Sequence, residues 1–128
     1  MAYAEIPSEI QSFIERHLTT STELEVLLLL HRDEARHWTP AAVGRELRID
    51  DDQAGKALAR LAADGLFLGE EPGYRFAPRR PRTAALINKL AALYPSYRVA
   101  MISLIFAKPR GAIRDFAEAF RIKPEDEV

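Results

Sequence analysis

The sequence of 128 residues contains no cysteine. This absence excludes disulfide bonds, zinc sites with thiolate ligands and cysteine nucleophiles, and it fits the reducing conditions of a cytoplasm. No basic stretch leads into an apolar run at the N-terminus, and the run EVLLLL at residues 25–30 is far shorter than a membrane span. We therefore expect a cytoplasmic protein that does not enter a membrane.

Signals of catalysis and of metal or cofactor binding are missing as well. The sequence has no glycine-rich phosphate loop and no motif that pairs a nucleophile with a base. Its three histidines, His17, His31 and His37, lack the spacing of metal ligands. The run Asp50 to Asp52 cannot converge on one cation, because adjacent side chains at a helix start point in different directions. We therefore predict no enzyme, no cofactor and no metal site.

Positive charge is balanced by negative charge in total, and it is unevenly placed. The formal net charge is -1, so the chain lacks the overall basic character of a strongly electrostatic nucleic-acid binder. Residues 1–38 carry 3 Lys and Arg against 7 Asp and Glu, residues 39–78 carry 5 against 7, and residues 79–128 carry 10 against 5. The positive charge therefore gathers after residue 78, where RRPR at residues 79–82 is the one compact basic run.

The first part of the chain contains two helix signals. Over the stretch TSTELEV a threonine can cap a helix with a glutamate three residues on, as Thr20 with Glu23 or Thr22 with Glu25. The apolar residues 26–30 that follow would lie nearly all round this helix, which predicts a central core helix. Before it, apolar residues recur at the spacing of an amphipathic helix: Ile6, Ile10, Phe13 and Ile14.

The middle of the chain predicts a short helix, a turn and a longer helix. Thr39 followed by Pro40 supplies a cap and a proline at the first helical position, which starts the short helix. Asp50 or Asp51 then caps the longer helix, whose apolar residues keep a buried spacing over residues 51–63.

Extended structure is expected on either side of these helices. Gly65 suits the left-handed conformation that ends a helix. Two brief extended runs at residues 66–68 and 74–77 flank a turn of glycine, glutamate and proline. We also expect Trp38 to anchor a short extended piece before the short helix. The resulting order is helix, turn, helix, hairpin.

Residues 39–78 resemble the winged-helix domains of bacterial regulators of the MarR and ArsR kind, in which a helix, a turn, a capped helix, the junction L-x-x-DGLF and a wing recur. The resemblance implies a mainly α (α+β) fold, a winged helix-turn-helix with a small β-hairpin wing and long C-terminal helices. Residues 1–78 are then the winged-helix domain and residues 79–128 a C-terminal helical dimerisation segment. The helix at residues 51–63 is expected in the major groove of double-stranded DNA.

Candidate DNA contacts follow from this resemblance. On the helix at residues 51–63, Gln53 and Arg60 can each form bidentate bonds to base edges, and Lys56 can contact DNA or pair with Asp52 at helical spacing. Ordinary solvated surface is the alternative for the arginines. Phosphate contacts are expected from Arg45, Arg48, Arg75, Arg79, Arg80 and Arg82.

Carboxylates lie where the DNA phosphates would approach. Asp50, Asp51 and Asp52 stand at the start of the groove helix, and Glu70 and Glu71 stand near the tip of the wing. One aspartate serves as a cap, which stabilises a helix by roughly 0.5 to 2 kcal/mol, but the others repel phosphates. These charges favour an alternative function, a winged-helix module for protein–protein interaction with little or no DNA affinity.

A long apolar stripe follows Pro81. Pro95 interrupts it, and because the pattern continues in phase we predict one kinked helix. The stripe exceeds what one small domain covers, so we predict a homodimer through residues 83–121, with a helix folded back on its own domain as the alternative. The stripe consists of Leu86, Leu90, Leu93, Tyr97, Met101 and Leu104. A last amphipathic helix is expected from Ile113, Phe116, Ala117 and Phe120.

The sequence thus supports two functions of different classes. The first is a DNA-binding transcriptional regulator of winged-helix type that acts as a cytoplasmic homodimer. The second is a winged-helix interaction module that binds a protein partner. Trp38, Tyr94 and Tyr97 could line an effector pocket, although they are more simply explained as core residues.

Overall fold

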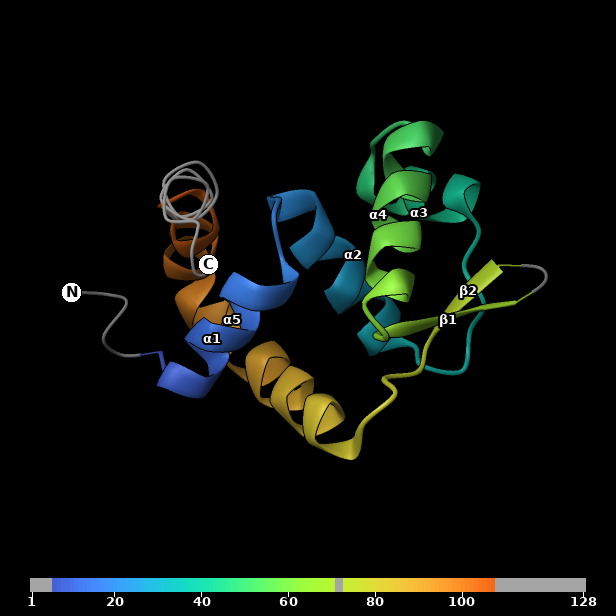
Figure 1. Cartoon of the computed structure of the whole chain (residues 1–128). Coiled ribbons are helices and arrows are strands. Elements are labelled where there is room, and N and C mark those ends of the chain that lie inside the picture. The colour runs from blue at the N-terminus through green and yellow to red at the C-terminus, as the bar shows by residue number, and fades with distance from the viewer. Residues whose placement is uncertain (1–5, 71–72, 108–128) are drawn as a thin grey trace, which may run out of the picture.

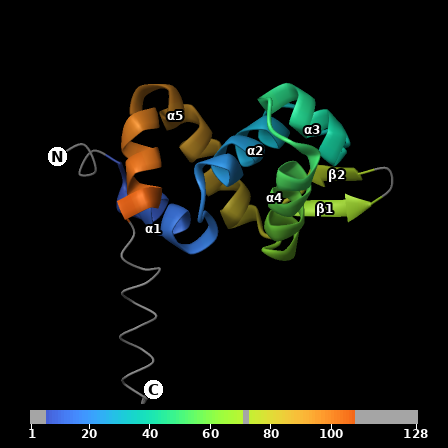
Figure 2. The same cartoon turned by 90° about the horizontal axis from the view of Figure 1, so that it is seen from above.

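A computed structural model describes residues 6–70 and 73–107 of the chain. These residues fold into a mainly helical structure with one small antiparallel sheet, as the sequence predicts. Figures 1 and 2 show α2 in the middle, with α3, α4 and the hairpin on one side and with α1 and most of α5 on the other. The elements in chain order are α1 (Ser8–His17), α2 (Ser21–Arg32), α3 (Pro40–Leu47), α4 (Asp51–Ala63), β1 (Phe67–Glu70), β2 (Gly73–Phe76) and α5 (Pro81–Ala107).

The predicted caps fix the starts of the three central helices. Thr20, Thr39 and Asp50 each accept, through a side-chain oxygen, a hydrogen bond from the backbone N–H three residues on, at 3.1, 3.0 and 2.7 Å. Each cap satisfies an amide that has no partner inside its helix. The end of α4 is also as predicted, since Gly65 follows it with a φ of 85°.

A tight turn joins α3 to α4. Arg48 ends α3 in the left-handed conformation, with φ 60° and ψ 49°, which costs a residue with a side chain roughly 1–2 kcal/mol. The Ile49 N–H then donates a hydrogen bond of 3.0 Å to the Gly44 carbonyl. A Cβ atom on Gly44 would lie only 2.8 Å from the Ile49 carbonyl oxygen and from Asp51 Oδ1. The turn therefore depends on a residue without a side chain at position 44.

The hairpin is held to the rest of the fold by Trp38. Strands β1 and β2 pair antiparallel, with the buried Phe67 opposite the buried Phe76. The Trp38 N–H donates a hydrogen bond of 2.6 Å to the Tyr74 carbonyl, and the Tyr74 N–H donates one of 2.8 Å in return. The extended piece predicted at Trp38 is thus confirmed, and the predicted strand ends differ from the observed ones by one or two residues.

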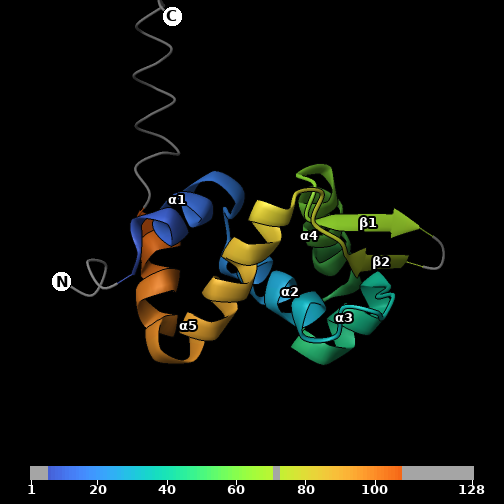
Figure 3. The same cartoon turned by 90° about the horizontal axis from the view of Figure 1, so that it is seen from below.

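Helix α5 bends sharply, and Figure 3 shows its two halves as the arms of a V. The break lies at Tyr97, whose φ of -124° and ψ of 25° are not helical. Pro95 explains it, because proline has no N–H to donate and its ring clashes with the carbonyl one turn earlier. The interruption predicted at Pro95 is therefore present, but it folds the helix back more sharply than a kink in one continuous rod.

Part of the apolar surface of α5 is buried inside the protein. By length and composition the helix could cross a membrane, with a mean hydropathy of 1.5 in its most apolar window. Within the described residues the bend at Tyr97 leaves straight pieces of at most 16 residues, and about 20 residues are needed to span a bilayer. Ile87, Leu90 and Met101 are buried in the core, and in all 28% of the most apolar window is buried.

One core joins all five helices. It runs from Ile6 and Ile10 beside α1, through Leu27 and Leu30 of α2, to Leu104 near the end of α5. The described part of the predicted C-terminal segment therefore contributes residues to the same core as the helices before it. The last predicted helix, with Ile113, Phe116, Ala117 and Phe120, lies outside the described residues.

A pair of glycine substitutions tests the turn. We expect Gly44→Ala to lower the free energy of unfolding by about 1–3 kcal/mol, because the new methyl group meets the backbone of Ile49. Gly55→Ala in α4 is the matched control, since its Cβ would meet only Pro40 at 3.5 Å. That control should raise stability by up to about 1 kcal/mol through helix propensity. Urea denaturation measures the free energy of unfolding of both variants. Equal changes in the two variants would contradict the geometry of the turn.

Candidate nucleic-acid interface

The outward face of α4 is the surface that the sequence assigns to DNA. Asp51, Asp52, Gln53 and Lys56 are all exposed on it. Lys56 Nζ lies 3.2 Å from Asp52 Oδ2, which is the helical pairing that the sequence offered as the alternative to a DNA contact. The pair is largely exposed, so it contributes well under about 1 kcal/mol and can open. Gln53 and Lys56 are thus the polar side chains on this face that could contact DNA, and the exposed Ala59 and Ala63 lie beside them.

Arg60 does not join this face. Its Nε donates a hydrogen bond of 2.9 Å to Glu23 Oε2 on α2, and its Nη2 donates another to the His17 carbonyl at the end of α1. Asp64, one turn further along α4, lies 3.9 Å from the same guanidinium. The prediction that Arg60 faces the groove therefore does not match its placement, because a buried carboxylate on the neighbouring helix attracts it inward.

From the sequence, Glu23 is predicted only as part of a helix cap. It is buried, and its Oε1 accepts hydrogen bonds from the N–H of Thr19 at 2.8 Å and from the Thr19 hydroxyl at 3.0 Å. Its other oxygen binds Arg60. No spacing rule connects positions 23 and 60, so this ion pair could not be found from the sequence.

The arginines predicted to contact phosphates fall into two groups. Arg45 and Arg48 are exposed at the end of α3 and in the turn before α4, where they flank the outward face of α4. Arg75 is half-buried in β2 opposite Leu68. Glu70 ends β1, and Glu71 lies outside the described residues. The acidic hairpin tip is therefore still a prediction from the sequence.

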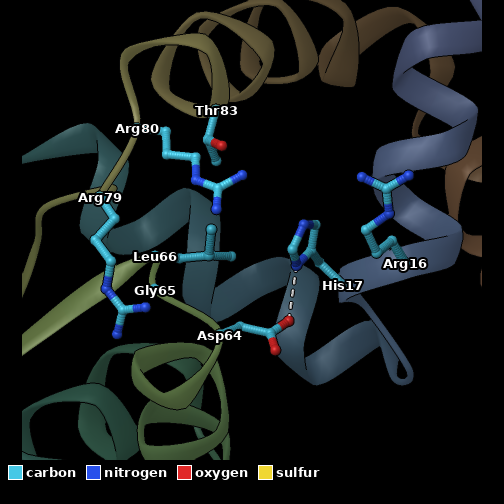
Figure 4. A pocket seen from close by; sticks show the side chains of 8 residues that line it. All are labelled: Arg16, His17, Asp64, Gly65, Leu66, Arg79, Arg80 and Thr83. Atoms are coloured by element: carbon cyan, nitrogen blue, oxygen red, sulfur yellow. Dashed lines mark hydrogen bonds and ion pairs between the residues drawn. The ribbon is translucent and has the colours of Figure 1, made fainter.

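The second group lies elsewhere, beside α1. Figure 4 shows Arg16, His17 and Arg80 directed toward the space between α1 and the start of α5, while Arg79 points away beside Gly65. Arg80 and Arg82 line this space together with residues of α1. The structure thus separates the basic run at residues 79–82 from the turn that carries Arg48.

The stripe predicted for dimerisation faces the protein's own core. Leu90, Met101 and Leu104 are buried, and Leu86, Leu93 and Tyr97 are half-buried against the same core. The reason is the bend at Tyr97, which lets both halves of α5 pack on one domain. The residues of α5 that remain most exposed are Val99 and Phe106, at 72% and 71%.

The three aromatic residues weighed for an effector pocket are placed differently. Trp38 is buried in the core, and Tyr97 is half-buried at the bend. Tyr94 lines a cavity of about 580 Å³ between α2, α3 and α5, beside Leu28 and Leu47, and this cavity is lined by neither Trp38 nor Tyr97. The core explanation therefore holds for Trp38.

Comparison with models of protein families, with curated proteins and with solved structures gave no match for this chain. Its function must therefore be argued from the geometry of its own residues. Among the described residues, no group of three His, Cys, Asp or Glu side chains is placed to hold a metal ion.

Two substitutions on α4 separate a structural role from a binding role. Arg60→Ala should lower the free energy of unfolding by about 2 kcal/mol, because it leaves Glu23 buried without its cation. This is less than for a fully buried pair, since 35% of the Arg60 side chain is exposed. Lys56→Ala should change stability by less than about 0.5 kcal/mol. Chemical denaturation of both variants checks the difference, and a neutral Arg60→Ala would contradict the pairing.

Proposed function

We propose that this chain is a winged-helix DNA-binding domain that acts as a cytoplasmic homodimer in transcriptional regulation. The observation that supports it most is the order of α3, a tight turn, α4 and a hairpin, with Trp38 bridged to β2 as a third extended segment. A helix-turn-helix of this kind presents its second helix to the major groove, and the hairpin lies beside it as the wing.

The turn before α4 supplies the best candidates for phosphate contact. Arg45 and Arg48 are exposed there, next to the helix that would enter the groove. Arg48 also occupies a left-handed conformation that glycine would adopt without strain. Strain at an exposed position is a pointer to function, because nothing in the packing requires a long cationic side chain there.

Base contacts from one chain are few. With Arg60 held by Glu23, the face of α4 offers Gln53 and Lys56 to base edges, while Asp51 and Asp52 repel the backbone. A single domain should therefore bind weakly and with little sequence preference. A two-fold dimer doubles the contacts, which is why the homodimer belongs to the proposal.

A protein-interaction module is the second candidate, and the composition of α4 favours it. The outward face has two exposed aspartates, small alanines at positions 59 and 63, and one lysine already paired with Asp52. Such a face suits a basic protein surface as well as it suits DNA. The two functions differ in one measurable property, the salt-dependent affinity for a DNA duplex.

Electrophoretic retardation of random duplex at two salt concentrations tests the first function. The intact chain should be retarded at low salt and released at higher salt, because the bound phosphates regain their counterions. Arg45→Ala together with Arg48→Gly should lower the salt slope by about 2, and Arg48→Gly removes the charge while relieving the strained backbone. Asp52→Asn should strengthen binding.

Arg98→Ala is the control for these variants, because Arg98 is an exposed arginine on the second half of α5. It should leave the retardation unchanged. If the intact chain does not retard DNA at low salt, the result would favour the protein-interaction module over the DNA-binding domain. Equal losses of DNA affinity in the Arg45, Arg48 and Arg98 variants would show that only the overall charge matters. That result would exclude the turn between α3 and α4 as a contact site.

Dimerisation needs a surface other than the predicted stripe, and the outer face of the second half of α5 provides one. Val99, Ile102 and Phe106 lie on one side of the helix, and two of them are largely exposed. Light scattering at micromolar concentration should give twice the chain mass, and Phe106→Asp should reduce it to one chain. Leu68→Asp, at the exposed apolar residue of β1, is the control. A single-chain mass for the intact protein would exclude the homodimer.

A further inference from the structure

The cleft beside α1 collects more positive charge than its neighbours neutralise. Two adjoining cavities of about 240 and 460 Å³ share Arg16, His17, Arg80 and Thr83 along their walls. Arg79 borders the first cavity and Arg82 the second. Arginines from two distant parts of the sequence therefore line these cavities, and Arg16 and Arg80 line both of them.

The carboxylates of the cleft have cations of their own. The Asp64 carboxylate accepts a hydrogen bond of 2.7 Å from His17 Nδ1 and also lies near Arg60. Glu9 accepts a hydrogen bond of 2.5 Å from Lys89, and this ammonium holds the pKa of the Glu9 carboxyl below its usual value. Arg82 also interacts with the Glu9 carboxylate, whereas neither carboxylate is paired with Arg16 or Arg80.

Arg16 and Arg80 are the two arginines best placed for a ligand. Both side chains point into the cleft from opposite walls in Figure 4, and both residues are exposed to solvent. Within residues 6–70 and 73–107, neither guanidinium is paired with a carboxylate. Like charges that face each other across a cleft repel unless an anion lies between them.

We propose that this cleft binds a small phosphate-bearing molecule. Arg16 and Arg80 clamp the phosphate from two sides, since a guanidinium matches phosphate oxygens with paired donors. The Thr83 hydroxyl, on the same wall as Arg80, donates a further hydrogen bond. The larger cavity, which Phe13 and Leu86 also line, receives the organic part of the molecule.

The size of the cleft favours a small molecule over a DNA strand. Cavities that hold small ligands measure about 300–1,000 Å³; the larger space, of about 460 Å³, falls in this range, and the smaller one, of about 240 Å³, adjoins it. A duplex backbone needs phosphate contacts spread along a groove-facing surface. Arg16 and Arg80 instead face each other across a confined space, away from the turn that carries Arg45 and Arg48.

Titration calorimetry of the intact chain with inorganic pyrophosphate, without DNA and at constant ionic strength, tests the proposal. We expect saturable binding and a higher midpoint of thermal unfolding in its presence. Arg16→Gln and Arg80→Gln should each weaken binding by about tenfold or more, because a charged hydrogen-bond donor is lost. Arg32→Gln is the matched control: Arg32 is exposed on α2, paired with Glu46, and does not line the cleft.

Three outcomes would overturn the proposal. The first is no binding of pyrophosphate to the intact chain, and the second is equal binding by the Arg16→Gln, Arg80→Gln and Arg32→Gln variants. The third is loss of duplex retardation in Arg16→Gln and Arg80→Gln without any pyrophosphate binding, which would assign the arginines to DNA phosphates. Circular dichroism confirms that the variants fold. Pyrophosphate binding with no duplex retardation would support the cleft and count only against the proposed function.

Discussion

The buried carboxylate of Glu23 is the constraint on which the arrangement of the helices depends. It lies at the start of α2, accepts hydrogen bonds from Thr19 in the connection from α1, and binds Arg60 of α4. Arg60 in turn donates to the His17 carbonyl at the end of α1. A buried charge without a partner is strongly destabilising. The three helices are therefore held in one relative position, because any other position separates Glu23 from at least one donor.

This ion pair connects the fold to both candidate surfaces. By drawing Arg60 inward it removes the one arginine from the middle of α4, so the outward face keeps Gln53 and Lys56 against Asp51 and Asp52. Arg60 also contacts His17 and Asp64, and these two residues line the smaller cavity beside α1. Stability and surface chemistry thus depend on the same few residues, and a change at Arg60 would alter both.

Features that depend on neighbours in the sequence could be predicted. Capping oxygens at Thr20, Thr39 and Asp50, and the left-handed Gly65, act over three or four residues and fix where helices begin and end. The hairpin followed from its turn residues and from the two brief extended runs beside them. Even the short extended piece at Trp38 was visible, although its pairing with Tyr74 depends on the tertiary fold.

Features that depend on distant residues could not be predicted. The periodicity of the sequence showed that α5 has an apolar stripe. It does not show whether a second copy of the chain or the chain's own domain packs against that stripe. The bend after Pro95 is what packs both Leu90 and Met101, from the two halves of the helix, into one core. The charge pattern has the same limitation, because Arg60 and Arg80 both looked like DNA contacts. The first is held by a carboxylate 37 positions away, and the second faces an arginine of α1.

Arg45 and Arg48 lie at the turn before α4, whereas Arg60 is held by Glu23, and this placement limits how well the protein could distinguish DNA sequences. Phosphate contacts at Arg45 and Arg48 would hold a duplex without regard to sequence, since base edges carry the sequence information and phosphates do not. Only Gln53 and Lys56 remain to read bases on α4, and Lys56 must first leave Asp52. Each good bidentate contact discriminates between bases by about 1–3 kcal/mol, and α4 offers at most two residues for such contacts. Under the proposed function a single chain would therefore discriminate weakly between sequences, and a second copy would double the number of base contacts.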